Sequence, residues 1–172
     1  MKRSIAVLAA LLALAMPALA HAATSCLLCS DSEKKDWIEQ EAALPAYPKM
    51  ENLIAFYGGA ANPHRYYVDP DSLSVGADGV VRYTLVVKAA GGATNVSYEG
   101  MRCTTGEQKL YALGQAGGKW VPARDPQWRP IESRQYMRHY NELYEQIFCR
   151  EMVIPAAPKL VSALKRAAAE LR

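Results

Sequence analysis

Residues 80–88 read VVRYTLVVK, and this stretch decides the fold. Its odd-numbered positions from 81 to 87 are all apolar or aromatic, whereas Arg82, Thr84 and Lys88 stand at even-numbered positions. Alternation with a period of two is typical of a β-strand that buries one face and exposes the other. We therefore predict a half-buried strand whose odd-numbered face lies on the core and whose Arg82 face is open to solvent.

Turn-forming residues separate this strand from other strand candidates on both sides. Gly76-Ala77-Asp78-Gly79 precedes it and Gly91-Gly92 follows it. Short strands joined by such turns pair antiparallel with their neighbours along the chain. The expected strands are residues 65–69, which Asp69-Pro70 ends, then 80–88, 94–103, 108–113 and 119–123, with residues 52–57 covering or joining the sheet.

The alternation changes phase within residues 94–103. Val96 and Tyr98 share one parity, whereas Met101 and Cys103 share the other, and Gly100 stands at the change. Glycine inside a strand often marks a β-bulge. We predict a one-residue bulge at Gly100, which would turn all four of these side chains inward.

Helical spacing dominates the last third of the chain. Apolar and aromatic residues recur three and four positions apart in residues 134–148, which predicts an amphipathic helix packed on the sheet. Pro155 and Pro158 separate it from a final alanine-rich helix over residues 159–171. A short helix over residues 36–43 is expected to end before Pro45. The predicted fold class is α+β, with a single antiparallel sheet of four to six strands packed against a C-terminal helix.

The first 22 residues have the pattern of a secretory signal peptide. Lys2 and Arg3 precede an uncharged apolar run that is shorter than the roughly 20 residues of a membrane span. We expect export to the periplasm, a flexible mature start over residues 23–35, and one α+β domain over residues 36–172.

Four cysteines in an exported chain are expected to form disulfides. Cys103 ends a predicted strand and Cys149 follows a predicted helix, so we expect these two to pair and to join the sheet to the helix. Cys26 and Cys29 follow the leader closely, and three alternatives stay open for them. They could form a local or intermolecular disulfide or a disordered pair, Cys26 could be lipidated, or the pair could serve redox or metal chemistry.

The charge balance argues against nucleic-acid binding. Without Lys2 and Arg3, the 20 basic residues become 18, against 17 acidic residues. Proteins that bind nucleic acids cluster many more lysines and arginines than this, because they must displace counterions from the phosphates. The one basic-rich stretch, residues 159–172, is interpreted as a solvated helix face.

No catalytic or metal-binding pattern stands out in the sequence. The mature chain offers only His64 and His139 as neutral-pH bases, and we interpret both as surface or boundary residues. Asp69, Asp71 and Asp78 lack the regular spacing of a calcium loop and fit turn formation instead. We therefore expect no cofactor, no metal and no enzymatic activity.

A candidate binding patch follows from the predicted strand faces. Arg82 would point outward, and a bulge at Gly100 would bring Glu99 and Arg102 to the same open face. Such a group is either a cross-strand ion-pair ladder or a patch that contacts an anion or a glycan. The aromatic residues expected to frame it are Tyr66, Tyr67 and Trp120.

Several strings, taken in their order along the chain, resemble the cryptic neisserial protein-like (CNP1-like) family. They are residues 44–48 (LPAYP), 51–53 (ENL), 67–70 (YVDP) with Ser72-Leu73, 78–84 (DGVVRYT), 95–100 (NVSYEG) and Arg102-Cys103. The resemblance covers residues 36–149 and implies a Gram-negative envelope protein, either periplasmic or lipid-anchored. It implies no activity and no catalytic residue.

These observations favour a non-enzymatic periplasmic module that binds or scaffolds an envelope protein or a glycan. The alternative is a lipid-anchored outer-membrane or adhesin-type component, which would contact a membrane only if Cys26 is lipidated. A periplasmic enzyme is the least favoured interpretation.

Overall fold

The computed structural model describes residues 37–60, 62–132, 137–151 and 154–171. The predicted signal peptide, the predicted flexible start over residues 23–35, and both Cys26 and Cys29 lie outside the described residues. No helix within the described ranges is long and apolar enough to cross a membrane.

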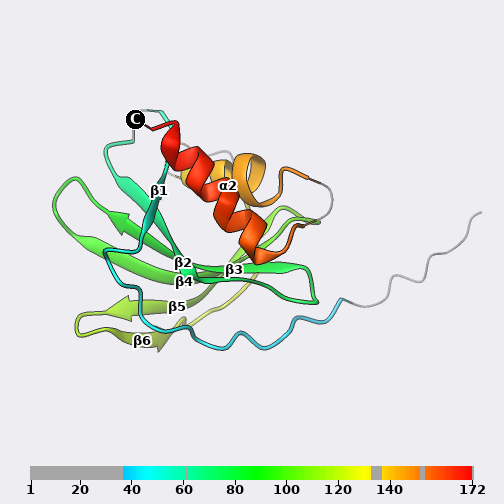
Figure 1. The fold of residues 1–172 in the computed structure, drawn as a ribbon. Helices are drawn as coiled ribbons and strands as arrows, with labels where there is room; N and C mark the ends of the chain where they lie inside the picture. The colour runs from blue at the N-terminus through cyan, green and yellow to red at the C-terminus, as the bar shows by residue number, and fades with distance from the viewer. Residues whose placement is uncertain (1–36, 61, 133–136, 152–153, 172) are drawn as a thin grey trace, which may run out of the picture. The chain divides into compact units, whose positions relative to one another are not determined.

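One antiparallel sheet forms the framework of the described chain (Figure 1). Its strands follow the order β1-β2-β3-β4-β5-β6, so each strand pairs with its neighbours in sequence, and β7 pairs with β5. Within the described residues this makes seven strands, one more than the predicted upper limit. Their bounds are β1 Ile54–Phe56, β2 Arg65–Val75, β3 Val80–Lys88, β4 Thr94–Arg102, β5 Glu107–Gln115, β6 Lys119–Pro122 and β7 Arg129–Pro130.

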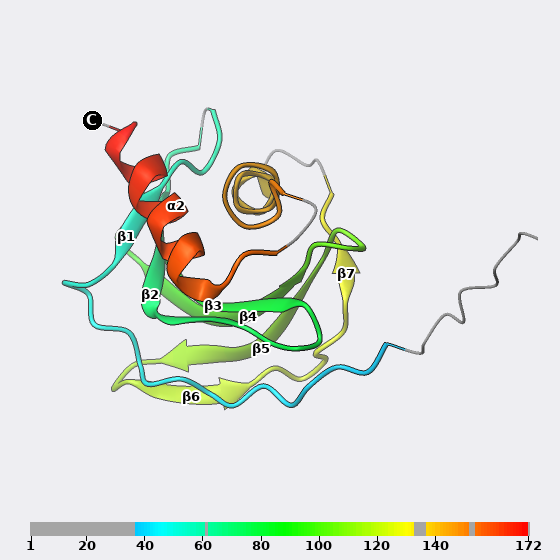
Figure 2. The same ribbon diagram turned by 45° about the vertical axis from the view of Figure 1, so that its right-hand side comes forward.

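In the described part of the chain, helical segments cover one face of the sheet, as Figures 1 and 2 show. They are α1 (Arg138–Asn141), the π-helix η2 (Glu142–Phe148) and α2 (Ala157–Ala169). The main hydrophobic core lies between them and the sheet. There the ring centroids of Tyr83 and Phe148 lie 5.0 Å apart. The predicted helix over residues 134–148 is confirmed from Arg138 to Phe148, where α1 continues into η2 and packs on the sheet. The final helix, predicted over residues 159–171, is observed as Ala157–Ala169.

A disulfide links Cys103 to Cys149 and so joins the end of β4 to the end of η2. The two Cα atoms lie 5.2 Å apart, and 46 residues separate the cysteines in sequence. The predicted α+β class and the predicted disulfide between sheet and helix are therefore confirmed.

The predicted helix over residues 36–43 is wrong for the residues that the structure describes. Residues 37–48, called the strap from here on, form no helix and run extended across the other face of the sheet (Figure 2). Their polar groups bond to the sheet and its turns instead of to one another. Pro45 and Pro48 also favour extended backbone in the residues before them.

Because of the strap, β3 is buried on both faces. Val81, Tyr83 and Leu85 lie in the core below the helices, as predicted. Arg82 and Thr84 are also buried, so the prediction of an open Arg82 face is wrong. The alternation located the strand correctly, but a second covered face is not visible in the alternation itself.

The predicted bulge at Gly100 is wrong as well. Pairing of β3 with β4 runs without interruption from Val80↔Arg102 to Lys88↔Thr94. The register shift lies on the other side of β4, where Tyr111 of β5 is left without a partner between Leu110 and Ala112. Gly100 is needed because the Tyr111 ring lies across it, and a Cβ there would stand 2.6 Å from the Tyr111 hydroxyl.

The strand that was predicted to end at Asp69 continues to Val75. Pairing between β2 and β3 shifts between Asp69 and Ser74, so the Asp-Pro pair produces an irregularity within the strand. The expected turn bonding is present there, because Asp71 donates its backbone N–H to Asp69 Oδ1 and Ser72 Oγ donates to the Asp69 carbonyl.

Candidate functional site

The strap is attached to the sheet through indole groups near both of its ends. Trp37 Nε1 donates to the Asp78 carbonyl at 2.8 Å, and Trp120 Nε1 of β6 donates to the Pro45 carbonyl at 2.9 Å. Trp128 Nε1 donates to Glu39 at 3.1 Å. The chain has three tryptophans, so every indole N–H in it takes part in a strap contact.

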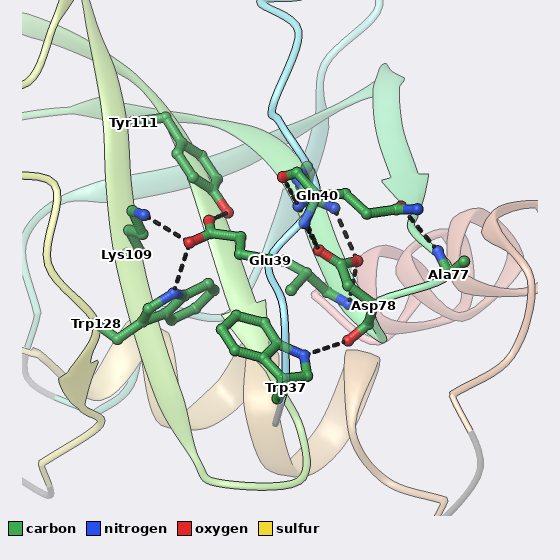
Figure 3. A network of polar contacts seen from close by, with 10 residues as sticks. Trp37, Glu39, Gln40, Ala77, Asp78, Lys109, Tyr111 and Trp128 are labelled. Atoms are coloured by element: carbon green, nitrogen blue, oxygen red, sulfur yellow. Dashed lines mark hydrogen bonds and ion pairs between the residues drawn. The ribbon is translucent and has the colours of Figure 1, made fainter. Parts of the chain in front are cut away.

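Glu39 of the strap occupies a socket of three donors (Figure 3). Its carboxylate accepts hydrogen bonds from Lys109 Nζ at 2.7 Å, Tyr111 Oη at 2.8 Å and Trp128 Nε1 at 3.1 Å. Burial alone would raise the pKa of Glu39, but these hydrogen bonds and the Lys109 charge outweigh it and lower that pKa. Glu39 is therefore ionised at neutral pH. We call Lys109, Tyr111 and Trp128 the carboxylate socket.

A second charged group fixes the strap beside the β2–β3 turn. Arg82 Nη1 and Nη2 reach the two oxygens of Asp78 at 3.2 and 2.6 Å, and Nη2 also donates to the Gln40 carbonyl. Asp78 in turn accepts from the Gln40 backbone N–H at 2.8 Å. Only 6% of the Arg82 side chain and 1% of the Asp78 side chain are exposed. Burial would raise the pKa of Asp78, but the bonds from Arg82, Gln40 and Val80 lower it overall.

Arg102 provides the third cation on this face. Its guanidinium carbon lies 3.7 Å from the centroid of a Trp37 ring and 5.6 Å from that of Trp128, and Nη1 pairs with Glu107 at 3.0 Å. Stacking of arginine on an aromatic face is a favourable cation–π contact. Trp37 therefore anchors the strap by its ring as well as by its N–H.

A hollow of about 740 Å³ opens beside the carboxylate socket. The strap forms one wall of it from Glu39 to Leu44, and Lys109 and Tyr111 of β5 form another. Pro122, Ala123 and Pro126 complete the lining. The lining of the hollow thus combines the charged side chains of Glu39 and Lys109 and the Tyr111 hydroxyl with apolar alanine, leucine and proline side chains.

The predicted binding patch is not assembled as an open face. Arg82 of β3 lies opposite Gly100, and Arg102 of β4 lies opposite Val80, so the two arginines share one face, but the strap covers that face. Trp120 lies on the same side and holds the strap at Pro45. Glu99 pairs with Tyr83 on the opposite, helix-covered face.

The two other aromatic residues of the predicted patch also lie apart from it. Tyr67 stacks under Lys88, with Nζ 5.0 Å from the ring centroid. Tyr66 is buried in the core and stacks on His139 at 4.6 Å. Neither ring frames Arg82 or Arg102, because Tyr66 lies in the core and Tyr67 pairs with Val86 of β3, four residues from Arg82.

Glu99 forms a buried network between the sheet and α1. Its carboxyl group accepts hydrogen bonds from three hydroxyl groups, those of Ser97 at 2.6 Å, Tyr83 at 3.2 Å and Tyr140 at 3.2 Å. Burial raises the pKa of Glu99, and the three hydrogen bonds only partly oppose this. The network connects β3, β4 and α1 in the core.

His139 is buried, so its interpretation as a surface or boundary residue is wrong. It lies between the rings of Tyr66 and Tyr140, and its Nδ1 has no hydrogen-bond partner in the described part of the chain. Burial lowers the pKa of His139 to about 4, and His64 adds a smaller effect in the same direction. His64 is exposed, as expected, and its Nδ1 accepts from the Ala90 backbone N–H.

Sequence reasoning missed the strap residues and the carboxylate socket. Trp37 and Glu39 were assigned to a helix, so their contacts with β5 and with the β2–β3 turn were not anticipated. Pro45 and Pro48, which favour extended backbone in the residues before them, are the signal that could have indicated an extended segment. Across the described ranges, no group of three or more His, Cys, Asp or Glu residues is placed to hold a metal ion.

Comparison with known proteins identifies a family for this fold and site. The CNP1-like family model matches residues 32–165, which include the strap, all seven described strands and most of α2. No curated protein and no solved structure matches the chain. The family match covers most of the sequence and agrees with the resemblance found from the ordered strings. The chain therefore belongs to the CNP1-like family.

Proposed function

We propose that the protein is an exported cell-envelope module that binds a ligand in the hollow beside the strap and catalyses no reaction. The observation that carries this proposal is the hollow of about 740 Å³ next to Glu39, Lys109 and Tyr111. Binding sites are typically concave, largely apolar and supplied with a few fixed polar groups. The lining, which combines apolar residues with Glu39, Lys109 and Tyr111, fits that description.

The electrostatics of the site support binding more than catalysis. General acids and bases work best when their pKa values lie near the working pH. Despite burial, the hydrogen bonds that Glu39 and Asp78 accept lower the pKa of both carboxyl groups, so both hold their charge at neutral pH. Each is bonded to a fixed cation, Lys109 or Arg82. Groups held in this way position a ligand well but are poorly suited to exchange protons with it.

The proposed location is the periplasm, on the strength of the leader-like first 22 residues and the Cys103–Cys149 disulfide. The alternative is an outer-membrane or adhesin-type component anchored through a lipid on Cys26. Intact-mass spectrometry of protein from the native envelope distinguishes the two. A mass that matches cleavage after Ala20 or Ala22 supports the periplasmic form, whereas a mass that begins at Cys26 with added acyl chains supports the anchored form.

Site-specific photo-crosslinking in the native host tests the binding site. A photo-reactive phenylalanine analogue is introduced at Leu44, which lines the hollow and is 46% exposed. The matched control is Ile38, which belongs to the same strap and is 80% exposed but does not line the hollow. We expect a discrete crosslinked product at position 44 and none at position 38.

Two crosslinking results would contradict the proposal. The absence of product at both positions would leave the hollow without a ligand, and equal products at both would mean that contact is not specific to the hollow. Chemical conversion of the captured ligand by the purified protein would favour the enzyme alternative instead.

A further inference from the structure

The strap occupies its face of the sheet through side-chain sockets and single backbone bonds. Residues 37–48 form no ladder with any described strand. The sheet side instead supplies fixed groups to an extended chain: Asp78 and Arg82 bond to the backbone of Gln40, and Trp120 bonds to the carbonyl of Pro45. Backbone contacts of this kind would accept any extended polypeptide with a suitable path.

Two positions of the strap are recognised by their side chains. Trp37 lies on the Arg102 guanidinium at 3.7 Å, and two residues later the Glu39 carboxylate enters the socket of Lys109, Tyr111 and Trp128. The three donors come from β5 and from the loop before β7. The sheet face therefore contacts an aromatic side chain and, two residues later, an acidic side chain, and it makes no such contact with the side chain between them.

The carboxylate socket depends on its acidic occupant for charge balance. Arg82 is neutralised by Asp78, and Arg102 is paired with Glu107, both within the sheet and its turns. Lys109 is paired with Glu39, which the strap supplies. With the strap in place the side chain of Lys109 is only 14% exposed, so a strap that leaves would uncover an unpaired cation and three donors directed at one point.

We propose that the carboxylate socket is a recognition site for an acidic extended segment of another envelope protein, and that the strap fills it in cis. This inference takes the envelope location from the proposed function but adds a second site, because a segment that replaces the strap removes one wall of the hollow and binds the sheet face instead. The partner segment carries an aromatic residue two positions before a glutamate or aspartate. It replaces Trp37 on Arg102 and Glu39 in the socket, and it takes over the bonds from Asp78, Arg82 and Trp120.

Because the strap competes with the partner segment for the socket, it determines the concentration of partner that binding requires. A segment tethered to its site by a short linker competes at an effective concentration of about millimolar. A free peptide with the strap sequence should therefore displace the strap of the wild-type protein only at about millimolar concentration. Weakening the strap in cis while the socket stays intact should lower that concentration substantially.

The test uses the full chain and a labelled peptide with the sequence of residues 37–48. The protein variant E39K places a second ammonium group against Lys109, so the strap is repelled while the socket remains. Fluorescence anisotropy measures peptide binding to this variant, and circular dichroism verifies that it remains folded. A second variant, W37A, loosens the strap by removing the stack on Arg102 and replaces E39K if that variant does not fold.

We expect the strap-weakened variant to bind the peptide at concentrations well below those that the wild type needs. A peptide in which the glutamate at position 39 is replaced by glutamine should bind about ten- to a hundredfold more weakly, because hydrogen bonds to a charged group are the stronger kind. K109M added to the protein variant should reduce this difference between the two peptides, because it removes the charged donor of the socket while Tyr111 and Trp128 remain.

Three results would overturn the inference. They are no binding to the folded variant, equal affinity for the two peptides, and discrimination between the peptides that is undiminished in K109M. A wild-type dimer in sedimentation that K109M dissociates would assign the socket to the strap of a second copy, and so would overturn the assignment to another protein. None of these results affects crosslinking at Leu44, so the proposed function can fail or stand separately.

Discussion

Replacing Asp78 by asparagine tests how strongly the buried ion pair below the strap stabilises the domain. The substitution preserves the shape of the side chain but removes the charge that faces Arg82 at 2.6 Å. The Arg82 cation would remain almost completely buried, and its Nε already has no hydrogen-bond partner among the described residues. Breaking a buried pair by removing one partner destabilises a protein by about 3–5 kcal/mol. We expect the free energy of unfolding of D78N to be lower than that of the wild type by this amount.

The expected loss is large compared with the total stability of a domain, which is about 5–15 kcal/mol. Urea denaturation of the oxidised mature protein, followed by circular dichroism, measures it. The chain also offers a matched control, because Asp125 and Arg129 form a second pair with the same sequence spacing, at 3.2 Å. Their side chains are 60% and 63% exposed, so D125N should cost less than about 1 kcal/mol.

The pH dependence of D78N provides a second readout of the same pair. The hydrogen bonds of the native state, with Arg82 first, outweigh the effect of burial, so the pKa of Asp78 is lower in the folded than in the unfolded chain. Its contribution is therefore complete above the unfolded pKa and is lost as the pH falls through the folded pKa. The difference in stability between wild type and D78N should shrink on acidification. A D78N loss no greater than that of D125N at neutral pH would refute the reasoning.

Three further predictions concern other parts of the fold. The 46-residue separation of Cys103 and Cys149 predicts that C103A/C149A has a free energy of unfolding about 4 kcal/mol lower than the wild type, as measured by urea denaturation. A loss below about 1 kcal/mol would contradict the role of the disulfide as the link between β4 and η2. G100A should lower the free energy of unfolding by about 1–3 kcal/mol and weaken the strap, because the new Cβ meets the Tyr111 ring. In the control G91A the new Cβ has nothing within 4 Å, so the change should stay within about 0.5 kcal/mol. Similar losses in both variants would show that Tyr111 does not need Gly100. Burial raises the pKa of Glu99 despite its three hydrogen bonds, so wild-type stability should decline relative to E99Q as the pH rises from the ordinary glutamate value through the folded pKa. Parallel stability curves for wild type and E99Q would argue against that raised pKa.

The strands and the disulfide could be predicted because their signals are local. The alternation of residues 80–88, the glycine turns and the helical spacing of residues 134–148 each depend on near neighbours in sequence. Pairing of Cys103 with Cys149 followed from their places at the ends of two such elements. The family resemblance, read from ordered strings over residues 36–149, also agrees with the match over residues 32–165.

The candidate site could not be predicted because its contacts are long-range. Glu39 meets Lys109, Tyr111 and Trp128 across 70 to 89 residues of sequence. Period two identifies alternate faces of a strand but does not say that both are covered, so Arg82 was assigned to solvent. The phase change near Gly100 was explained by a bulge on the assumption of one buried face. With two covered faces, Tyr98 packs against the Trp120 and Tyr111 rings while Met101 enters the main core, and no bulge in β4 is required.

The central claim is that the strap lies on the sheet face and fills the carboxylate socket, and the three indole N–H groups report on it directly. Trp120 and Trp128 donate to acceptors on the strap, Pro45 and Glu39. Trp37 belongs to the strap and donates to the Asp78 carbonyl of the sheet side. All three hydrogen bonds therefore require the strap to be in place. Nuclear magnetic resonance of the ¹⁵N-labelled mature protein resolves these groups one by one. We expect three dispersed indole signals that exchange slowly with water at neutral pH, and in E39Q the largest shift at Trp128. Three clustered, rapidly exchanging indole signals beside protected amides in β3 and β4 would show a folded sheet without a seated strap and would contradict the account.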